Sequence, residues 1–426
     1  MTIAVFLLSL LVAMMIGVPI AFSLLLCGAA LMWHLNMFDA QILAQNVIEG
    51  ANSFPLLAVP FFMLAGEVMN AGGLSKRIVG LALALVGHVR GGLGYVAILA
   101  ALMMAALSGS AVADAAALSA LLLPMMVAAG HDKARSAGLL ASSAIIAPII
   151  PPSIGFVIFG VAANVSISKL FLAGIVPGLL LGASLWVTWW WVARKEQVTP
   201  PPRKSMAEVR QALQDATFAL GLPLIVVVGL KFGVFTPTEA AVVAAVYAMG
   251  VSIFIYGELK ISQMYGLLLA AAKTTAVVMF LVAAAMVSAW MITVAQLPDE
   301  LVKLLKPFLD SPKLLMFIIM LLVMVVGTAM DMTPTILILT PVLMPIVKAA
   351  GIDPVYFGVL FIINNAIGLI TPPVGTVLNT VAGVGKVSMD DVIRGVMPFM
   401  IAQFTLMFLM VLFPQIVLWP ARWLAG

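Results

Sequence analysis

The sequence APIIPPSIGF, residues 147–156, places two adjacent prolines, a serine and a glycine inside a long apolar run. Proline has no backbone N–H to donate, and its ring clashes with the preceding turn of a helix, so a helix breaks or kinks there. The sequence GLITPPVGTV, residues 368–377, repeats the same arrangement. Both stretches predict an interrupted helix, and the residues on each side of the interruption are apolar enough to lie in a membrane.

The composition indicates a protein that crosses a membrane many times. Apolar residues make up 64% of the 426 residues and charged residues 9%, with a mean hydropathy of +1.21. Soluble domains carry about 25% charged residues. The single cysteine, Cys27, excludes an internal disulfide framework. Lys and Arg residues stand singly or in pairs between apolar segments, which argues against nucleic-acid binding.

Long apolar segments predict the full crossings of the membrane. The predicted crossings are 3–32, 54–70, 134–165, 170–193, 216–230, 238–256, 265–296, 354–385 and 395–416. The longest polar stretch, 194–215, is predicted to be a cytoplasmic connector between two halves of the chain.

Two further apolar blocks, 92–129 and 314–350, are interrupted midway by small and polar residues. The interruptions are SGSAVAD, residues 108–114, and GTAMDMTPT, residues 327–335. We expect each block to be a re-entrant hairpin with its tip inside the membrane. The alternative is a pair of ordinary spans joined by a short polar loop.

The hairpin tips are expected to lie beside the helix breaks. The helix before the first tip would be about 24 Å long and the one before the first break about 25 Å, at about 1.5 Å per residue. If both start at one face, tip and break reach a similar depth. Irregular backbone at this depth is tolerated only where it is buried in protein or lines a cavity. Each tip and break would shelter the other.

An internal repeat relates the two halves. A shift of 221 residues aligns glycines and prolines without a gap, and these residues dictate backbone geometry. The aligned pairs are Pro124 and Pro345, Gly130 and Gly351, Pro151 and Pro372, Pro152 and Pro373, Gly174 and Gly395, and Pro177 and Pro398. The predicted domains are a first repeat over 1–193 and a second over 216–426.

The distribution of Lys and Arg predicts the orientation. With the N-terminus in the cytoplasm, most of them fall inside, in 71–91, 130–133, 194–215, 257–264 and 386–394. The first hairpin then enters from the cytoplasm and the second from outside, so the repeats are inverted. Inverted repeats with broken helices that meet near the midplane are typical of secondary transporters.

The tips and breaks are also the candidate binding sites. Freed carbonyls and hydroxyls suit a hard cation, and the N-terminal ends of half-helices suit an anion. Two carboxylates lie near the tips, and ionisable groups at such depth are usually functional. We expect Asp331 to belong to an ion site rather than to cap a helix. For Asp114 both interpretations stay open.

Several stretches resemble the large membrane subunit of the tripartite ATP-independent periplasmic (TRAP) transporters, especially those for sugar acids of the 2,3-diketogulonate type. They are FPLLAVPFFMLAGEVMNAGGL (54–74), GVFTPTEAAVVAAVYA (233–248), SGSAVAD and both PP segments. The likeness covers essentially the whole chain. It implies a bacterial inner-membrane importer of an organic acid anion, such as a sugar acid, keto acid or dicarboxylate, driven by sodium through an elevator motion.

The resemblance also implies partners and ion sites. A periplasmic binding protein would deliver the substrate, and a small four-helix membrane subunit, a separate polypeptide here, would brace the chain. Sodium, the only metal expected, would bind at the two tip–break junctions. These correspond to Ser108, Gly109, Ser110, Pro151, Ser153 and Gly155, and to Gly327, Thr328, Asp331, Thr371, Pro373 and Gly375. We expect the substrate near Ser110, Ser153, Thr333 and Thr376.

Other functional classes remain to be weighed. A stand-alone anion transporter or ion exchanger with similar repeats would need no binding protein. An intramembrane enzyme would need a nucleophile with a base, or a metal cluster. The sequence contains no P-loop, GxSxG or HExxH motif. We therefore predict a protein that is not an enzyme and that uses no cofactor beyond the coupling ion.

Overall fold

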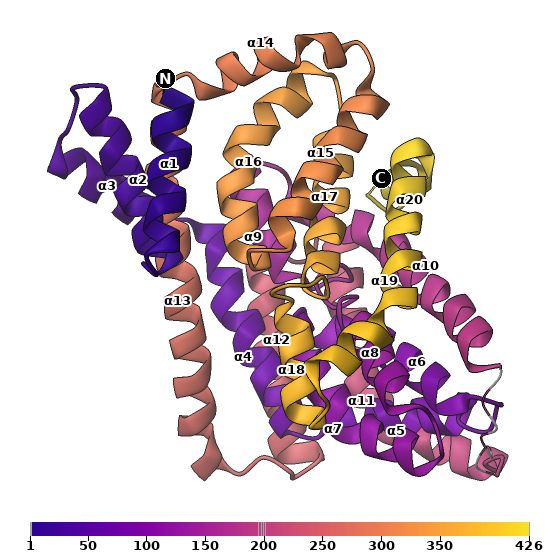
Figure 1. Ribbon diagram of the computed structural model, residues 1–426. Coiled ribbons are helices and arrows are strands. Elements are labelled where there is room, and N and C mark those ends of the chain that lie inside the picture. The colour runs from indigo at the N-terminus through magenta and orange to yellow at the C-terminus, as the bar shows by residue number, and fades with distance from the viewer. Residues whose placement is uncertain (1, 195, 197, 199, 201, 426) are drawn as a thin grey trace.

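The computed structural model describes residues 2–425 except 195, 197, 199 and 201, and every regular element in this part of the chain is a helix (Figure 1). Eight of the described helices are long and apolar enough to cross a membrane. The predicted fold class, an all-α polytopic membrane protein, is therefore confirmed.

The elements of the first half are α1 (Thr2–Met15), α2 (Ile20–His34), α3 (Ala40–Ala51), η1 (Phe54–Leu57), α4 (Ala58–Ala71), α5 (Leu74–Val86), α6 (Gly92–Ser108), α7 (Ala111–Ala128), α8 (Lys133–Ala144), α9 (Ile154–Ala163) and α10 (Ile167–Ala193). Those of the second half are α11 (Met206–Lys231), α12 (Pro237–Gly250), η2 (Val251–Ile255), α13 (Ile261–Val294), α14 (Leu297–Leu309), α15 (Pro312–Gly327), α16 (Met332–Ala349), α17 (Pro354–Gly368), α18 (Thr376–Gly385), α19 (Met389–Leu412) and α20 (Gln415–Ala425).

The inverted repeats are visible in the hairpins and the broken helices. Helices α6 and α7 form the first hairpin, and α15 and α16 form the second. In Figure 1 the broken helix α8–α9 runs upward, whereas α17–α18 runs downward, and both breaks lie near the middle of the molecule. The two hairpins point their tips toward this middle region from opposite ends.

The N-terminal segment differs from the prediction of one crossing over 3–32. The structure divides it into α1 and α2, which pack against each other. Gly17 between them has φ +85, a backbone conformation that glycine adopts at no steric cost, and Pro19 precedes α2. The GVP sequence at 17–19 is thus a turn signal of the kind that the sequence interpretation used elsewhere.

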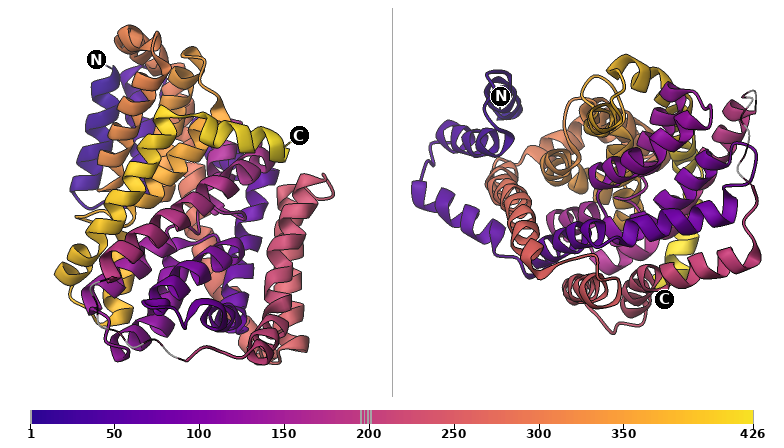
Figure 2. Two further views of the ribbon diagram at one scale, coloured as in Figure 1. Left: turned by 90° about the vertical axis from the view of Figure 1, so that its right-hand side faces the viewer. Right: turned by 90° about the horizontal axis from the view of Figure 1, so that it is seen from below.

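This extra turn changes where the N-terminus lies. In Figures 1 and 2 the N-terminus and α14 are at the same end of the molecule. The sequence interpretation had placed them on opposite sides of the membrane. Figure 2 also shows α1, α2 and α3 standing together at one side, where α2 and α3 contact α13.

Several segments outside the predicted crossings and hairpins are helical, among them α3, α5, α14 and the first part of α11. Helix α5 lies in the range 71–91 and buries Leu74, Ile78, Leu81 and Ala82 on one face. Helix α11 begins at Met206, because Ser205 and Glu208 form a capping box at its start. The connector between the repeats is therefore 194–205, and residues 195, 197, 199 and 201 of it lie outside the described part.

Candidate functional site

The first tip and the first break contact each other through bare backbone. Gly109, between α6 and α7, has φ +60, and a Cβ there would collide with the carbonyl oxygen of Pro152. Pro151, Ser153 and their neighbours in the break are buried. Only glycine therefore allows this tip to reach this break.

The second tip and the second break repeat this contact. A Cβ on Gly368 would lie 2.9 Å from the carbonyl oxygen of Gly327, the last residue of α15. Across the same junction Thr376 Oγ1 lies 3.4 Å from Asp331 Oδ1 and donates to it. Gly375, which precedes α18, has φ +39. The expected pairing of each tip with a break is thus observed in the geometry.

The two junctions adjoin each other. Gly155 is buried at the start of α9, and a Cβ there would lie 3.1 Å from Cε of Met332, at the start of α16. The N-terminal ends of α9 and α16 therefore face one region. The positive ends of two helix dipoles at one place favour an anion.

The hydroxyls at the junctions keep lone pairs for a cation. Thr328 Oγ1 donates to the carbonyl of Val325 at 2.7 Å, and Thr371 Oγ1 donates to Ile367 at 2.8 Å. A hydroxyl that gives away its one proton still has acceptor capacity. Hydroxyls and carbonyls of this kind fit a sodium ion. Within the described residues no cluster of three or more His, Cys, Asp or Glu side chains could hold a metal ion.

Two of the predicted residues are already bound to their own backbone. Ser153 donates to the carbonyl of Pro148 and accepts from the N–H of Phe156 at 3.1 Å, as the N-cap of α9. Ser110 caps α7 by accepting from the N–H of Ala113 at 3.4 Å.

The other predicted residues differ in exposure. Thr333 lies half-buried in the first turn of α16. Pro373 is exposed, so the second junction is more open than the first.

Asp331 occupies the N-cap position of α16 without capping it. Its side chain accepts no hydrogen bond from the first turn of the helix. The carboxylate is exposed and lies across from Thr376. The contacts of this carboxylate therefore offer no support for a simple capping role.

Cavities lead away from the first tip. One of about 80 Å³ is lined by Ser108 and Ser110 of the tip and by Glu67 and Asn70 of α4. It shares Glu67, Asn70 and Ala113 with a larger cavity of about 530 Å³ along α7. The first hairpin and α4 thus line two adjoining cavities, the smaller of which reaches the first tip.

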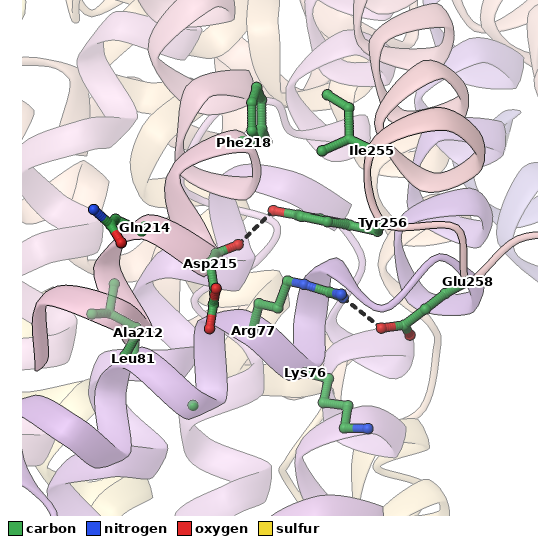
Figure 3. Close-up of a pocket in the computed structure, with 11 residues that line it drawn as sticks. Lys76, Arg77, Leu81, Ala212, Gln214, Asp215, Phe218, Ile255, Tyr256 and Glu258 are labelled. Carbon is green, nitrogen blue, oxygen red and sulfur yellow. Dashed lines mark hydrogen bonds and ion pairs between the residues drawn. The ribbon is translucent and has the colours of Figure 1, made fainter. Parts of the chain in front are cut away.

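A separate cavity of about 660 Å³ lies away from the tips (Figure 3). Figure 3 shows Arg77 of α5 between Tyr256 and Glu258. The guanidinium carbon lies 3.7 Å from the centre of the Tyr256 ring, and Nη1 lies 2.7 Å from Glu258 Oε1. Tyr256 in turn donates to the carbonyl of Asp215. These contacts join α5, α11 and the segment that follows η2, so we interpret this cavity as structural.

The chain matches a known family over nearly its whole length. Residues 7–416 fit the family model described as tripartite ATP-independent periplasmic transporter, DctM component. The chain belongs to this TRAP transporter family. Its expected resemblance to the large subunit of TRAP transporters is confirmed, and the protein is a multi-pass transport protein rather than an enzyme.

Relatives of this TRAP subunit carry substrate names. The chain is 56% identical to the 2,3-diketo-L-gulonate TRAP transporter large permease protein YiaN of Escherichia coli K12, over 100% of both chains. It is 37% identical to the C4-dicarboxylate TRAP transporter large permease protein DctM of Pseudomonas aeruginosa, over 94% of both. Among solved structures, the Alcanivorax borkumensis YdaH transporter has a similar fold, with a TM-score of 0.67 over 90% of this chain and 91% of that one, at 15% identity.

The structure brings two residues to the first junction of this TRAP subunit that were not among the predicted site residues. Glu67 and Asn70 line the cavity at the tip. Ser108 Oγ also donates to Asp114 Oδ1 at 2.6 Å, across the turn at Gly109. Nothing in the sequence near Glu67 places it beside the tip. The SGSxxxD spacing, in which a glycine turn separates serine from aspartate, could have indicated the second contact.

Proposed function

We propose that the chain is the large membrane subunit of a sodium-coupled TRAP importer that moves an organic acid anion from a periplasmic binding protein into the cytoplasm. The observation that carries the proposal is the pair of tip–break junctions that adjoin at Gly155 and Met332. Oxygen-rich backbone for a cation and two helix N-termini for an anion lie in one place there.

The proposed substrate is a hydroxylated carboxylate of the sugar-acid class. The relative named for 2,3-diketo-L-gulonate is 56% identical, whereas the one named for C4-dicarboxylates is 37% identical. Sodium would lie at each junction, held by backbone carbonyls with Ser108, Thr328 or Thr371. The substrate would lie between the junctions, near Ser110, Ser153, Thr333 and Thr376.

Transport would proceed by an elevator motion in the bacterial inner membrane. The hairpins and broken helices would move together against α4, α12 and α13. The end of the molecule that carries Lys76, Lys133, Lys260 and Lys386 is proposed to be cytoplasmic, because Lys and Arg favour that side. Since α1 and α2 form two helices, this orientation puts the N-terminus on the periplasmic side with α14, in place of the cytoplasmic position expected from the sequence.

Reconstitution tests the proposal. Vesicles that contain this chain, its small membrane subunit and the binding protein should take up a sugar acid only in the presence of a sodium gradient. The chain alone should transport poorly, because the binding protein and the small subunit are missing. The α14 region and the turn at 231–237 are the proposed docking surfaces. Full uptake by the chain alone would instead establish the stand-alone anion transporter.

A further inference from the structure

Asp114 is a buried carboxylate beside the first junction. It lies in the first turn of α7 with 0% of its surface exposed. Its Oδ1 accepts the Ser108 hydroxyl at 2.6 Å, and its Oδ2 has no hydrogen-bond partner among the described residues. No Lys, Arg or His of the described part forms an ion pair with it.

The hydrogen bond fixes the direction of the Ser108 hydroxyl. A serine hydroxyl has one proton, and a carboxylate has none to give, so Ser108 donates and Asp114 accepts. The oxygen of Ser108 then accepts from the N–H of Ser110 at 3.2 Å and keeps one lone pair. At the second junction Thr328 and Thr371 donate to helix carbonyls instead. Thr376 does donate to Asp331 there, but at 3.4 Å and to an exposed carboxylate, so the short hydrogen bond to a fully buried carboxylate distinguishes the first junction.

The charge of Asp114 needs a counter-charge. A carboxylate without water or an ion pair is costly inside a protein. The positive end of the α7 dipole offsets part of this cost, since Asp114 is in the first turn. Asp331, at the second junction, is exposed, so water stabilises its charge. The first junction is thus the one where a bound cation would relieve a buried charge.

We propose that Asp114 is the buried counter-charge of a sodium ion at the first junction and the residue that positions Ser108 Oγ as one of its ligands. This inference rests on the proposed sodium coupling and deepens it. It makes the two sodium sites unequal, one completed by a buried carboxylate and the other by an exposed one.

The test is sodium-dependent thermal unfolding of the purified full chain, with choline chloride holding the ionic strength constant. Sodium should raise the unfolding midpoint of the wild type, because it binds the folded state. Asp114→Asn keeps the size and an acceptor oxygen but removes the charge. We expect it to reduce the sodium-induced rise by half or more, while the second junction retains its own response. Without sodium its midpoint should not fall below that of the wild type, because the uncompensated charge is gone.

A purely structural role would give a different pattern. Asp114→Asn would then lower the midpoint equally with and without sodium, and this result would overturn the proposal. Ser108→Ala is the second variant, and it should also reduce the sodium-induced rise. A wild-type response in Ser108→Ala would overturn the positioning role even if Asp114→Asn failed to fold.

The control is Asp390→Asn, which changes an exposed aspartate in the first turn of α19 and should leave the sodium response unchanged. If the wild type itself shows no response to sodium, the proposed coupling and this inference both fail. If the wild type responds and Asp114→Asn responds equally, only the role of Asp114 fails.

Discussion

At the scale of single residues, the two junction carboxylates differ in surroundings although both follow a hairpin tip. Asp114 is fully buried and bonded to Ser108, whereas Asp331 is exposed at the start of α16. From the sequence alone Asp331 was the stronger candidate, because nothing in the sequence reports burial. If sodium binds at both junctions as proposed, we expect both carboxylates to affect the sodium response, Asp114 more than Asp331.

Asp331→Asn should fold normally but need more sodium. The Asp331 side chain makes no capping hydrogen bond to the first turn of α16, so its replacement should leave the helix start intact. Loss of the charge at the second junction should raise the sodium concentration for half-maximal uptake about tenfold, which corresponds to about 1.4 kcal/mol. The matched control is Asp353→Asn, because Asp353 caps α17 by accepting from the N–H groups of Val355 and Tyr356. An unchanged sodium dependence in Asp331→Asn would reduce this residue to a surface or capping role.

At the scale of the elements, the sequence predicted the repeats well and the amphipathic helices poorly. The breaks at 151–152 and 372–373 and both hairpins were predictable, because proline and glycine dictate backbone geometry wherever they occur. Helices α3, α5 and α14 were missed, since they mix polar and apolar residues and look like loops to a search for apolar runs. The contact between Gly109 and Pro152 was expected only as a shared depth, and its atoms needed tertiary structure.

Gly109→Ala should separate the first tip from the first break. The new Cβ would collide with the Pro152 carbonyl oxygen, and the φ of +60 adds strain. We expect most of the sodium-dependent uptake to be lost. Gly130→Ala is the control, because Gly130 has φ +93 but a Cβ there meets nothing within 4 Å. It should cost only the backbone strain of about 1–2 kcal/mol. Uptake normalised to the amount of membrane-inserted protein separates the two effects, and equal losses would argue against the junction contact.

The connector between the repeats is held to the first repeat by Glu196. Its carboxylate accepts from His131 Nδ1 at 2.6 Å and pairs with Arg135. Arg90 Nη2 also donates to the carbonyl of Glu196 at 3.4 Å. Burial raises the pKa of Glu196, but the hydrogen bond and charge of His131 together with Arg135 outweigh it, so the net pKa is lowered. The contact therefore contributes stability above the ordinary pKa of glutamate and loses it as the pH falls through the lowered value.

Glu196→Gln should lower the thermal unfolding midpoint at neutral pH, by an amount equivalent to about 1 kcal/mol. The gap between wild type and variant should close as the pH falls below about 4.3, the ordinary value for glutamate. Glu49→Gln, at an exposed position of α3, is the control and should show no such gap. A gap that stays constant down to low pH would mean that the charge of Glu196 does not stabilise the connector.

At the scale of the whole molecule, the proposed function would put one ion site on each side of a single substrate region, one at each junction of the inverted repeats. The two junctions contact each other at Gly155 and Met332, and we propose that they move together. Sodium ions and substrate anion would therefore cross together, and their charges add. The net charge moved per cycle would then depend on the two junctions that the fold provides as well as on their side chains.

Transport should consequently depend on the membrane potential. Two sodium ions with one monoanion move one net positive charge inward, which a potential of 100 mV drives with about 2.3 kcal/mol. We expect uptake of a monovalent sugar acid into vesicles that contain all three components to rise when a potassium diffusion potential makes the interior negative. A divalent dicarboxylate carried with the same two sodium ions would move no net charge, so its uptake should not respond to the membrane potential. Where the transporter accepts both substrates, the dicarboxylate is the control. Uptake of the monoanion that is indifferent to both sodium and potential would contradict two-site coupling, because the charges at both junctions would then take no part in the transport cycle.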